Sequence, residues 1–262
     1  MDTGFDRFAV IADVHGNVDA LRAVLEDIRH QGVEQILNLG DHFSGPLAAG
    51  ATADLIRGHG MISIRGNHDR WLAEVPPEEH SESEALAWPQ LSPFHRQWLQ
   101  DLPPVRRIGD QILMCHGTPE SDTEYLLERV TPDGKVVLDT AESIAAKAGE
   151  SDCSLILCGH THIARRVDLP DGRTILNPGS VGCPGYRSTE PVAHVVETGS
   201  PVASYALVER CGSNWITAIR GIPYDAANMI ALARQSTRAG WVPFLSTGRG
   251  AGENADTGQS AS

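Results

Sequence analysis

The sequence predicts an α/β fold with a layered sheet. Three short apolar runs each lead directly into a polar loop, and helical patterns follow the first two loops. The runs are residues 8–12, 35–39 and 61–64. Asn17 is the predicted N-cap of the first helix and Gly32 its predicted end. Strands that alternate with helices in this way are typical of α/β proteins.

The later part of the chain predicts further elements. A helix is expected to begin at Ser92-Pro93, and a hairpin to turn at Gly109-Asp110. Residues 74–83 are expected to form an acidic, Pro-rich loop, and the acidic cluster from Glu78 to Glu84 is expected to be solvated. Longer predicted stretches are mostly helix over 118–150, strands of a second sheet at 192–196, 204–208 and 215–219, and a helix over 224–238. Residues 1–245 are expected to form one domain, and residues 246–262 a disordered Gly/Ser-rich tail.

Composition narrows the class of protein. The chain has 262 residues, with 21 Lys and Arg against 34 Asp and Glu, for a formal net charge of −13. This acidic balance disfavours binding to a long nucleic acid, which calls for a basic surface. Five scattered cysteines without a CxxC pair, no signal-peptide pattern and no long apolar run predict a cytoplasmic protein without disulfides or membrane spans.

Polar side chains that can bind metals follow five of the predicted strands. They are Asp13 and His15, Asp41, Asn67 and His68, His116, and His160 with His162. Because ligands gather at the carboxyl ends of strands in α/β sheets, these side chains are expected at one sheet edge. Carboxylates together with imidazoles suit Mn, Fe, Co, Ni or Zn. This set of candidate ligands is too large for one ion, and it favours two divalent metals roughly 3.5–4 Å apart.

These blocks resemble those of the calcineurin-like metallophosphoesterases, and particularly their small bacterial phosphodiesterase-like members. The matching blocks occur in the family's order between residues 8 and 182: Asp13-Val14-His15, Gly40-Asp41, Gly66-Asn67-His68-Asp69, Cys115-His116-Gly117 and Gly159-His160-Thr161-His162. The loop Asn177-Pro178-Gly179-Ser180 resembles the loop that closes the site in those members. The resemblance implies a four-layer α/β/β/α sandwich of two mixed sheets flanked by helices.

The resemblance also implies a role for each residue. One metal would be held by Asp13, His15 and His162, the other by Asn67, His116 and His160, with Asp41 bridging the two. His68 matches the catalytic histidine, and Asp69 the acid that orients it. A hydroxide bridging the two metals would attack phosphorus while His68 assists the leaving oxygen. Arg65 and His42 are further candidates for contacts with the substrate.

The departures from the family pattern restrict the expected substrate. The stretch Gly40–Pro46 lacks the arginine of the serine/threonine protein phosphatases and of the symmetrical dinucleoside tetraphosphatases. The sequence therefore favours a hydrolase of small phosphodiesters as the function of the protein. The alternatives are a phosphomonoesterase or nucleotidase using the same site, a nuclease, and a non-catalytic metal-binding scaffold. The sequence leaves open the native metals, the oligomeric state and the role of the stretch after residue 183.

Overall fold

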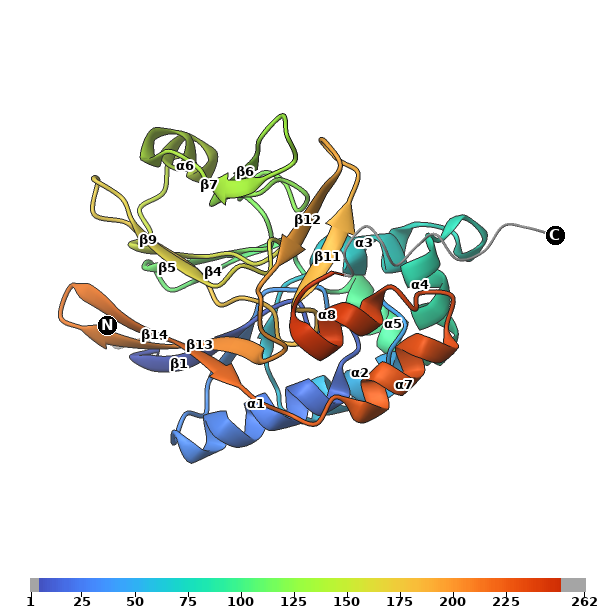
Figure 1. The fold of residues 1–262 in the computed structure, drawn as a ribbon. Helices are drawn as coiled ribbons and strands as arrows, with labels where there is room; N and C mark the ends of the chain where they lie inside the picture. Colours follow the sequence, from blue (N-terminus) through green and yellow to red (C-terminus); the bar gives the residue numbers. More distant parts are fainter. Residues whose placement is uncertain (1–4, 251–262) are drawn as a thin grey trace.

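Two five-stranded mixed sheets face each other in the structure, a computed structural model that describes residues 5–250 (Figure 1). The first sheet has the strand order β14-β13-β1-β2-β3. Its strands are β1 (Arg7–Ile11), β2 (Ile36–Asn38), β3 (Ile62–Ser63), β13 (Ala203–Cys211) and β14 (Asn214–Ile222). Strands β1, β2 and β3 are parallel, whereas β13 is antiparallel to β1 and β14 is antiparallel to β13.

The second sheet also has three parallel strands, but they lie at its centre and not at one edge. Its order is β4-β5-β8-β10-β9. The strands are β4 (Val105–Ile108), β5 (Ile112–Cys115), β8 (Leu155–Leu157), β9 (Arg165–Asp168) and β10 (Thr174–Asn177). Strands β5, β8 and β10 run parallel, and β4 and β9 close the two edges in the antiparallel direction. The predicted hairpin at Gly109 is confirmed as the turn between β4 and β5.

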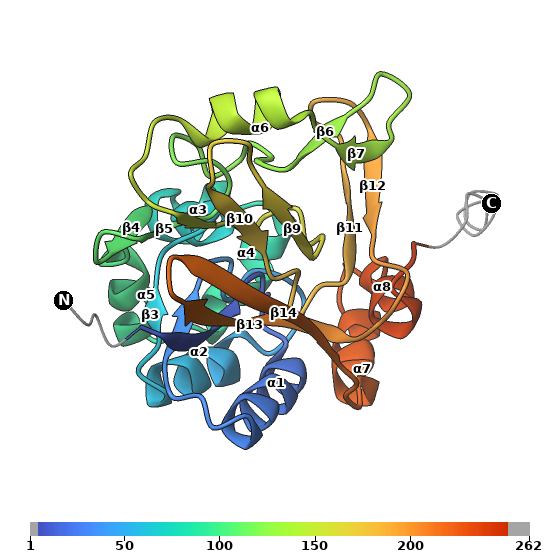
Figure 2. The same cartoon turned by 90° about the vertical axis from the view of Figure 1, so that its left-hand side faces the viewer.

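Helices cover the outer faces of both sheets. The helices are α1 (Val18–His30), α2 (Ala49–Gly58), α3 (Asn67–Glu74), α4 (Glu82–Ala87), α5 (Pro93–Gln100), α6 (Ala141–Ala148), α7 (Ala227–Gln235) and α8 (Trp241–Thr247), with short 3-10 turns η1 (Pro77–Glu79) and η2 (Trp88–Gln90). Figure 2 shows α1 and α2 outside the first sheet and α6 outside the second. The predicted N-caps are confirmed, since the side chains of Asn17 and Ser92 accept backbone N–H bonds at the starts of α1 and α5.

The alternation of side chains along the strands explains the four layers. In β1, Phe8 and Val10 lie in the core between the two sheets, whereas Ala9 and Ile11 pack in the core that includes α1 and α2. Strands β5 and β8 alternate in the same way between the central core and a third core against α6. Because successive side chains of a strand point to opposite faces, buried strands with helices outside give four layers. The predicted α/β/β/α sandwich is therefore confirmed.

Two sequence predictions differ from the structure in detail. Residues 118–150 are not mostly helical: they form the hairpin β6 (Glu128–Val130) and β7 (Val136–Leu138), and only α6 is a helix. The Pro-Asp-Gly turn and the β-branched residues beside it favour the hairpin. The strands of the region 192–219 do not form one separate sheet. Strands β13 and β14 extend the first sheet, and β11 (Gly185–Ser188) pairs with β12 (His194–Glu197) in a two-stranded ribbon.

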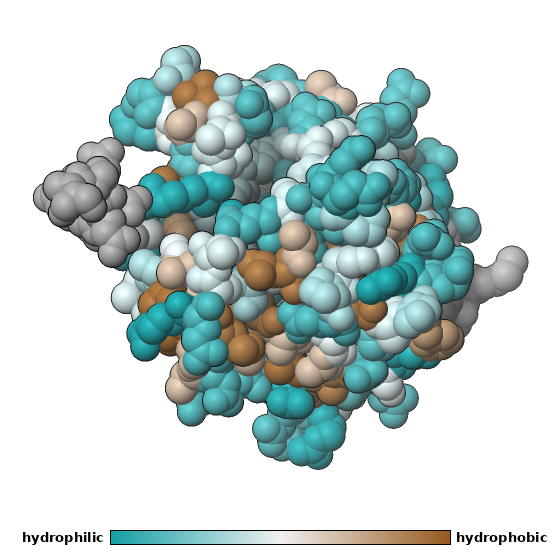
Figure 3. Space-filling model, turned by 90° about the vertical axis from the view of Figure 1, so that its right-hand side faces the viewer, coloured by the Kyte–Doolittle hydropathy of each residue, from teal (hydrophilic) through white to brown (hydrophobic). Residues whose placement is uncertain are grey.

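The C-terminal region is ordered further than the sequence predicts. Helix α8 continues to Thr247, Gly248 accepts a backbone bond from Gly199, and the Gly250 N–H donates to Glu197. The rest of the predicted tail, residues 251–262, lies outside the described residues. Figure 3 views the side that carries α7 and α8, where apolar patches are interrupted by hydrophilic side chains. Among residues 5–250, no helix combines the length and apolar character needed to cross a bilayer.

Candidate metal centre

The candidate ligands lie together where strands of both sheets end. The first sheet contributes its residues from the loops after β1, β2 and β3, and the second sheet from the loops after β5 and β8. Five candidate ligands have a positive φ, between 49° and 67°: Asp13, His15, Asp41, His160 and His162. Within residues 5–250 they are the only non-glycine residues with this backbone conformation. Such strained conformations concentrate at functional sites, and here they turn the side chains toward one point.

Asp13, His15 and His162 form the first cluster. The Nε2 atoms of the two histidines are 3.3 Å apart, and His162 Nε2 is 3.4 Å from Asp13 Oδ1. The other ring nitrogen of each histidine is held by a backbone carbonyl. His15 Nδ1 lies 3.0 Å from the oxygen of Ser44, and His162 Nδ1 lies 2.6 Å from that of Cys183. Such outer bonds fix the ring and leave Nε2 for a metal.

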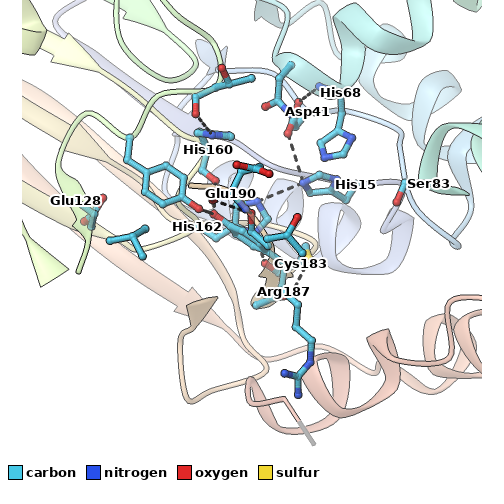
Figure 4. A pocket seen from close by; sticks show the side chains of 18 of the residues that line it. His15, Asp41, His68, Ser83, Glu128, His160, His162, Cys183, Arg187 and Glu190 are labelled. Carbon is cyan, nitrogen blue, oxygen red and sulfur yellow. Dashed lines mark hydrogen bonds and ion pairs between the residues drawn. The ribbon is translucent and has the colours of Figure 1, made fainter. Parts of the chain in front are cut away.

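Asp41, His116 and His160 form the second cluster. His116 Nδ1 lies 2.8 Å from the carbonyl oxygen of Leu39, and its Nε2 lies 3.3 Å from Asp41 Oδ2. In His160 the roles of the nitrogens are reversed, because Nε2 contacts the Thr123 carbonyl at 3.1 Å. Asp41 Oδ2 is also 3.7 Å from His15 Nε2 of the first cluster. The Asp41 carboxylate therefore contacts a histidine of each cluster. Figure 4 shows its contact with His15 from close by.

The donor atoms fit a pair of divalent cations. Asp13 Oδ1, His116 Nε2 and Asn67 Oδ1 are buried and have no hydrogen-bond partner within the protein. Buried polar atoms without partners are costly, so three of them at one place indicate a missing ligand. Oxygen and imidazole nitrogen donors are those that first-row divalent metals prefer. A metal at each cluster would satisfy these atoms.

The charges of the buried site depend on its close contacts. Burial alone would lower the pKa of His116, but the neighbouring Asp41 carboxylate raises it to about 9. Burial lowers the pKa values of both His15 and His160 to about 4. Burial opposes ionisation of Asp41, yet His116 and His68 hold its pKa well below the usual range. Without metal, the carboxylates are therefore charged at neutral pH. His116 is protonated and positively charged, whereas His15 and His160 are neutral.

Asp69 has a different position from the one predicted. Its carboxylate does not hydrogen-bond to His68. It accepts backbone N–H bonds from Asp41 at 2.7 Å, His42 at 3.0 Å and Gly66 at 2.9 Å, and it contacts His42 Nδ1 at 2.7 Å. The glycines of the two loops allow their backbones to approach closely, because a Cβ on Gly66 would clash with the Asp41 carboxylate oxygen. Asp69 therefore joins the loops after β2 and β3.

The partner of His68 is Glu84, a residue that the sequence analysis placed in a solvated loop. Glu84 lies in α4, is 1% exposed, and has its Oε1 2.5 Å from His68 Nδ1. Ser81 donates to the other carboxylate oxygen. The Ser-x-x-Glu pattern before Ala85 does indicate a helix start, but not which residue the glutamate would contact.

Arg65 and His42 do not lie in the cavity above the metal centre. The Arg65 guanidinium is paired with Glu74 at 2.6 Å. His42 is completely buried between Asp69 and the ring of Trp98, whose centroid is 5.1 Å away. Neither side chain lines the cavity. The structure therefore does not support their predicted contacts with a substrate.

A cavity of about 1440 Å³ opens above the metal centre. We call the candidate ligands and His68 the cavity floor. We call the side chains that surround this floor the cavity wall; its aromatic members are Trp71, Tyr125, Tyr186, Trp241 and Phe244. Rings of the wall contact histidines of the floor: Trp241 with His15, Trp71 with His68, Tyr186 with His162 and Tyr125 with His160, at centroid distances of 5.9, 4.8, 4.7 and 5.1 Å. No motif of the sequence indicated these wall residues.

Comparisons with known proteins agree with this geometry. Residues 7–200 match the model of the calcineurin-like phosphoesterase superfamily domain. An uncharacterized protein of Methanocaldococcus jannaschii is 27% identical over 190 residues, which cover 67% of this chain and 76% of that protein. The crystal structure of a metallophosphoesterase from Sphaerobacter thermophilus superposes with a TM-score of 0.70 and 27% identity, covering 93% of this chain and 100% of the other. The chain belongs to the calcineurin-like phosphoesterase superfamily.

Proposed function

We propose that this protein is a two-metal-dependent phosphoester hydrolase that prefers small phosphodiesters. The observation that carries the proposal is the pair of Asp/His clusters with Asp41 between them. When bound there, two divalent cations lower the pKa of water and neutralise charge on phosphoryl oxygens. The Asp41 carboxylate would be shared by the two ions, and the fixed histidine rings would keep the ions in place.

His68 is in position to assist the leaving group. It lines the cavity, its side chain is 27% exposed, and its ring centroid is 5.4 Å from that of His15. Because Glu84 engages Nδ1, Nε2 is the nitrogen left for a substrate. A proton on Nε2 can be donated to the oxygen that departs from phosphorus. General acid catalysis of this kind contributes roughly 10²–10⁴-fold.

The charges of the wall support the preference for diesters. Lys147 and Arg129 both lie beside Asp139, at 3.1 and 3.7 Å, and Arg238 lies 3.4 Å from Glu82. These three cations are thus already paired with carboxylates, and Arg187 is a further cation that lines the cavity. A monoester brings one more negative charge than a diester, and the carboxylates around the cavity would repel that charge. A diester would present a single negative charge to the metals and leave the wall to its organic groups.

Hydrolysis assays with added metals test this proposal. Metal-free protein would receive Mn²⁺, Ni²⁺, Co²⁺, Zn²⁺ or Mg²⁺, with bis(p-nitrophenyl) phosphate and p-nitrophenyl phosphate as the diester and the monoester. We expect metal-dependent cleavage that is faster for the diester than for the monoester. With methyl phenyl phosphate, whose leaving group is poorer, we expect a loss of at least ~100-fold in His68→Ala. Faster cleavage of the monoester would show a phosphomonoesterase instead. Protein that binds two metals and cleaves neither ester would contradict the proposal and favour a binding scaffold.

A further inference from the structure

The contact between Glu84 and His68 goes beyond the motifs that define the metal centre. Glu84 lies 16 residues after His68, in α4, and belongs to none of the blocks shared with the family. Its carboxylate is buried, and both of its oxygens have a partner: Oε1 contacts His68 Nδ1, and Oε2 accepts from Ser81. A buried carboxylate with only these two side-chain partners is placed to control the ring of His68.

Helix α4 is fixed to the metal centre by its own backbone. The Ser83 carbonyl accepts a bond of 3.1 Å from the N–H of Gly45, in the loop after β2 that also carries Asp41. Glu82 of the same helix pairs with Arg238, in the segment before α8, at 3.4 Å. Glu84 is therefore attached to the same loop as Asp41, so that its distance from the cavity floor is determined by the fold.

We propose that Glu84 is the positioning residue of His68 and directs the Nε2 proton of its ring toward the leaving oxygen of the substrate. The proposal rests on the proposed function. In the step concerned, a water-derived oxygen bonds to phosphorus, and the bond from phosphorus to the leaving oxygen breaks. The bonding electron pair stays on the leaving oxygen, which takes the Nε2 proton of His68. Glu84 holds the Nδ1 proton throughout, so the ring keeps its orientation and regains its Nε2 proton from solvent.

The proposal also names a substrate class. Protonation of the leaving oxygen matters most when the departing alkoxide is unstable, and least when it is a stabilised phenolate. An acid held by a buried carboxylate therefore fits phosphodiesters of poorly acidic alcohols, such as those of sugars, glycerol or nucleosides. Activated nitrophenyl esters would gain little from the same contact.

The test compares leaving groups in Glu84→Gln. We would measure kcat/KM for methyl p-nitrophenyl phosphate and methyl phenyl phosphate, whose leaving groups differ in acidity but hardly in shape. We expect a loss of roughly 10–100-fold for the phenyl ester, the range of a lost supporting contact, and a much smaller loss for the p-nitrophenyl ester. Glu79→Gln, in the exposed part of the same acidic segment, is the matched control and should leave both rates unchanged.

A double-mutant cycle separates positioning from a general structural effect. In a His68→Ala background, Glu84→Gln should cost nothing further, because Glu84 acts through the missing ring. Equal losses for both esters, or a loss that adds to that of His68→Ala, would overturn the proposal. If Glu84→Gln does not fold, Ser81→Ala removes the second bond to Glu84 and should show the same dependence on leaving group, to a smaller extent.

A spectroscopic measurement makes failure of this proposal distinct from failure of the proposed function. A bond as short as that between His68 and Glu84 gives its Nδ1 proton a far-downfield NMR resonance. This resonance should be absent in His68→Ala and Glu84→Gln and present in Glu79→Gln, whether or not any ester is cleaved. Its persistence in Glu84→Gln would show that another group holds Nδ1, and would overturn the proposal even in an active enzyme.

Discussion

The floor and the wall of the cavity are built in different ways. Each residue of the floor directly follows one of the parallel strands of the two sheets, or lies within the few residues after it. The aromatic side chains of the wall come from α3, α8, the strand β11 and the segment before β6, which are short elements and loops at the rim. The regular sheets thus hold the groups that bind metals, whereas irregular segments determine which organic groups fit beside them.

The first prediction tests whether the floor works as one unit. Asp41 lies within 3.7 Å of a histidine in each cluster, so its loss should affect both metals at once. In Asp41→Asn we expect hydrolysis to fall by roughly 10³-fold, which corresponds to the several kcal/mol that such metals contribute. Activity assays and metal analysis of the purified protein check this.

The matched control is Asp133→Asn, an exposed residue in the turn between β6 and β7 that should keep full activity and metal content. The bridging role is refuted if Asp41→Asn still binds two equivalents of metal and loses less than tenfold in rate.

The second prediction concerns Asp69, which holds loops of the floor together. Its buried carboxylate accepts three backbone N–H bonds and contacts His42, and in Asp69→Asn an amide N–H₂ would face some of these donors. We expect the free energy of unfolding to drop by about 3 kcal/mol, as for a broken buried charge network. Urea unfolding of the metal-free protein measures it.

This substitution also separates Asp69 from Glu84. A rate loss in Asp69→Asn should be the same for good and poor leaving groups, since Asp69 makes no hydrogen bond to His68. A stable Asp69→Asn protein with a selective loss on poor leaving groups would restore the role that the family motif implied.

The third prediction is a pH dependence of metal binding. In each cluster a nearby carboxylate outweighs the effect of burial and raises the pKa of one histidine, to about 9 for His116 and well above the usual value for His162. Because a metal binds only the neutral ring, it must displace about one proton per ion at pH 7. Apparent affinity should therefore rise about tenfold per pH unit and level off as the pH passes the pKa of the free site.

Calorimetry in buffers of different ionisation enthalpy counts these protons. His15 and His160, whose pKa values are about 4, are already neutral at pH 7 and should release none. An affinity that does not change between pH 6 and 8 would show that the metal-free clusters hold no such protons.

The sequence predicted the floor far better than the wall, for a physical reason. A parallel strand end places its next residues at a known sheet edge, so Asp13 and Asp41 could be brought together without coordinates. His116 follows a strand of the other sheet, and only the resemblance to the family placed it with them. The contact of Glu84 with His68 depends on where a six-residue helix packs, which local pattern does not determine. Asp69 shows the same limit. The family motif predicted an acidic residue at this position, but not the groups with which its carboxylate forms hydrogen bonds.

The last prediction tests the wall through Trp241. Its ring contacts His15 and lies over Gly45, where an added Cβ would come within 2.9 Å of the indole. We expect Trp241→Ala to raise KM for bis(p-nitrophenyl) phosphate by roughly 2–10-fold, the value of one lost aromatic contact, with kcat nearly unchanged. Methyl p-nitrophenyl phosphate has the same leaving group but a small second group, and its KM should change less.

Trp241→Phe should restore the KM for the bulky ester, and Phe94→Ala, on an exposed part of α5, should leave both KM values as they are. If Trp241→Ala instead lowered kcat equally for both esters, Trp241 would act on the floor through His15. The distinction between a floor that carries the chemistry and a wall that selects the organic group would then fail at this residue.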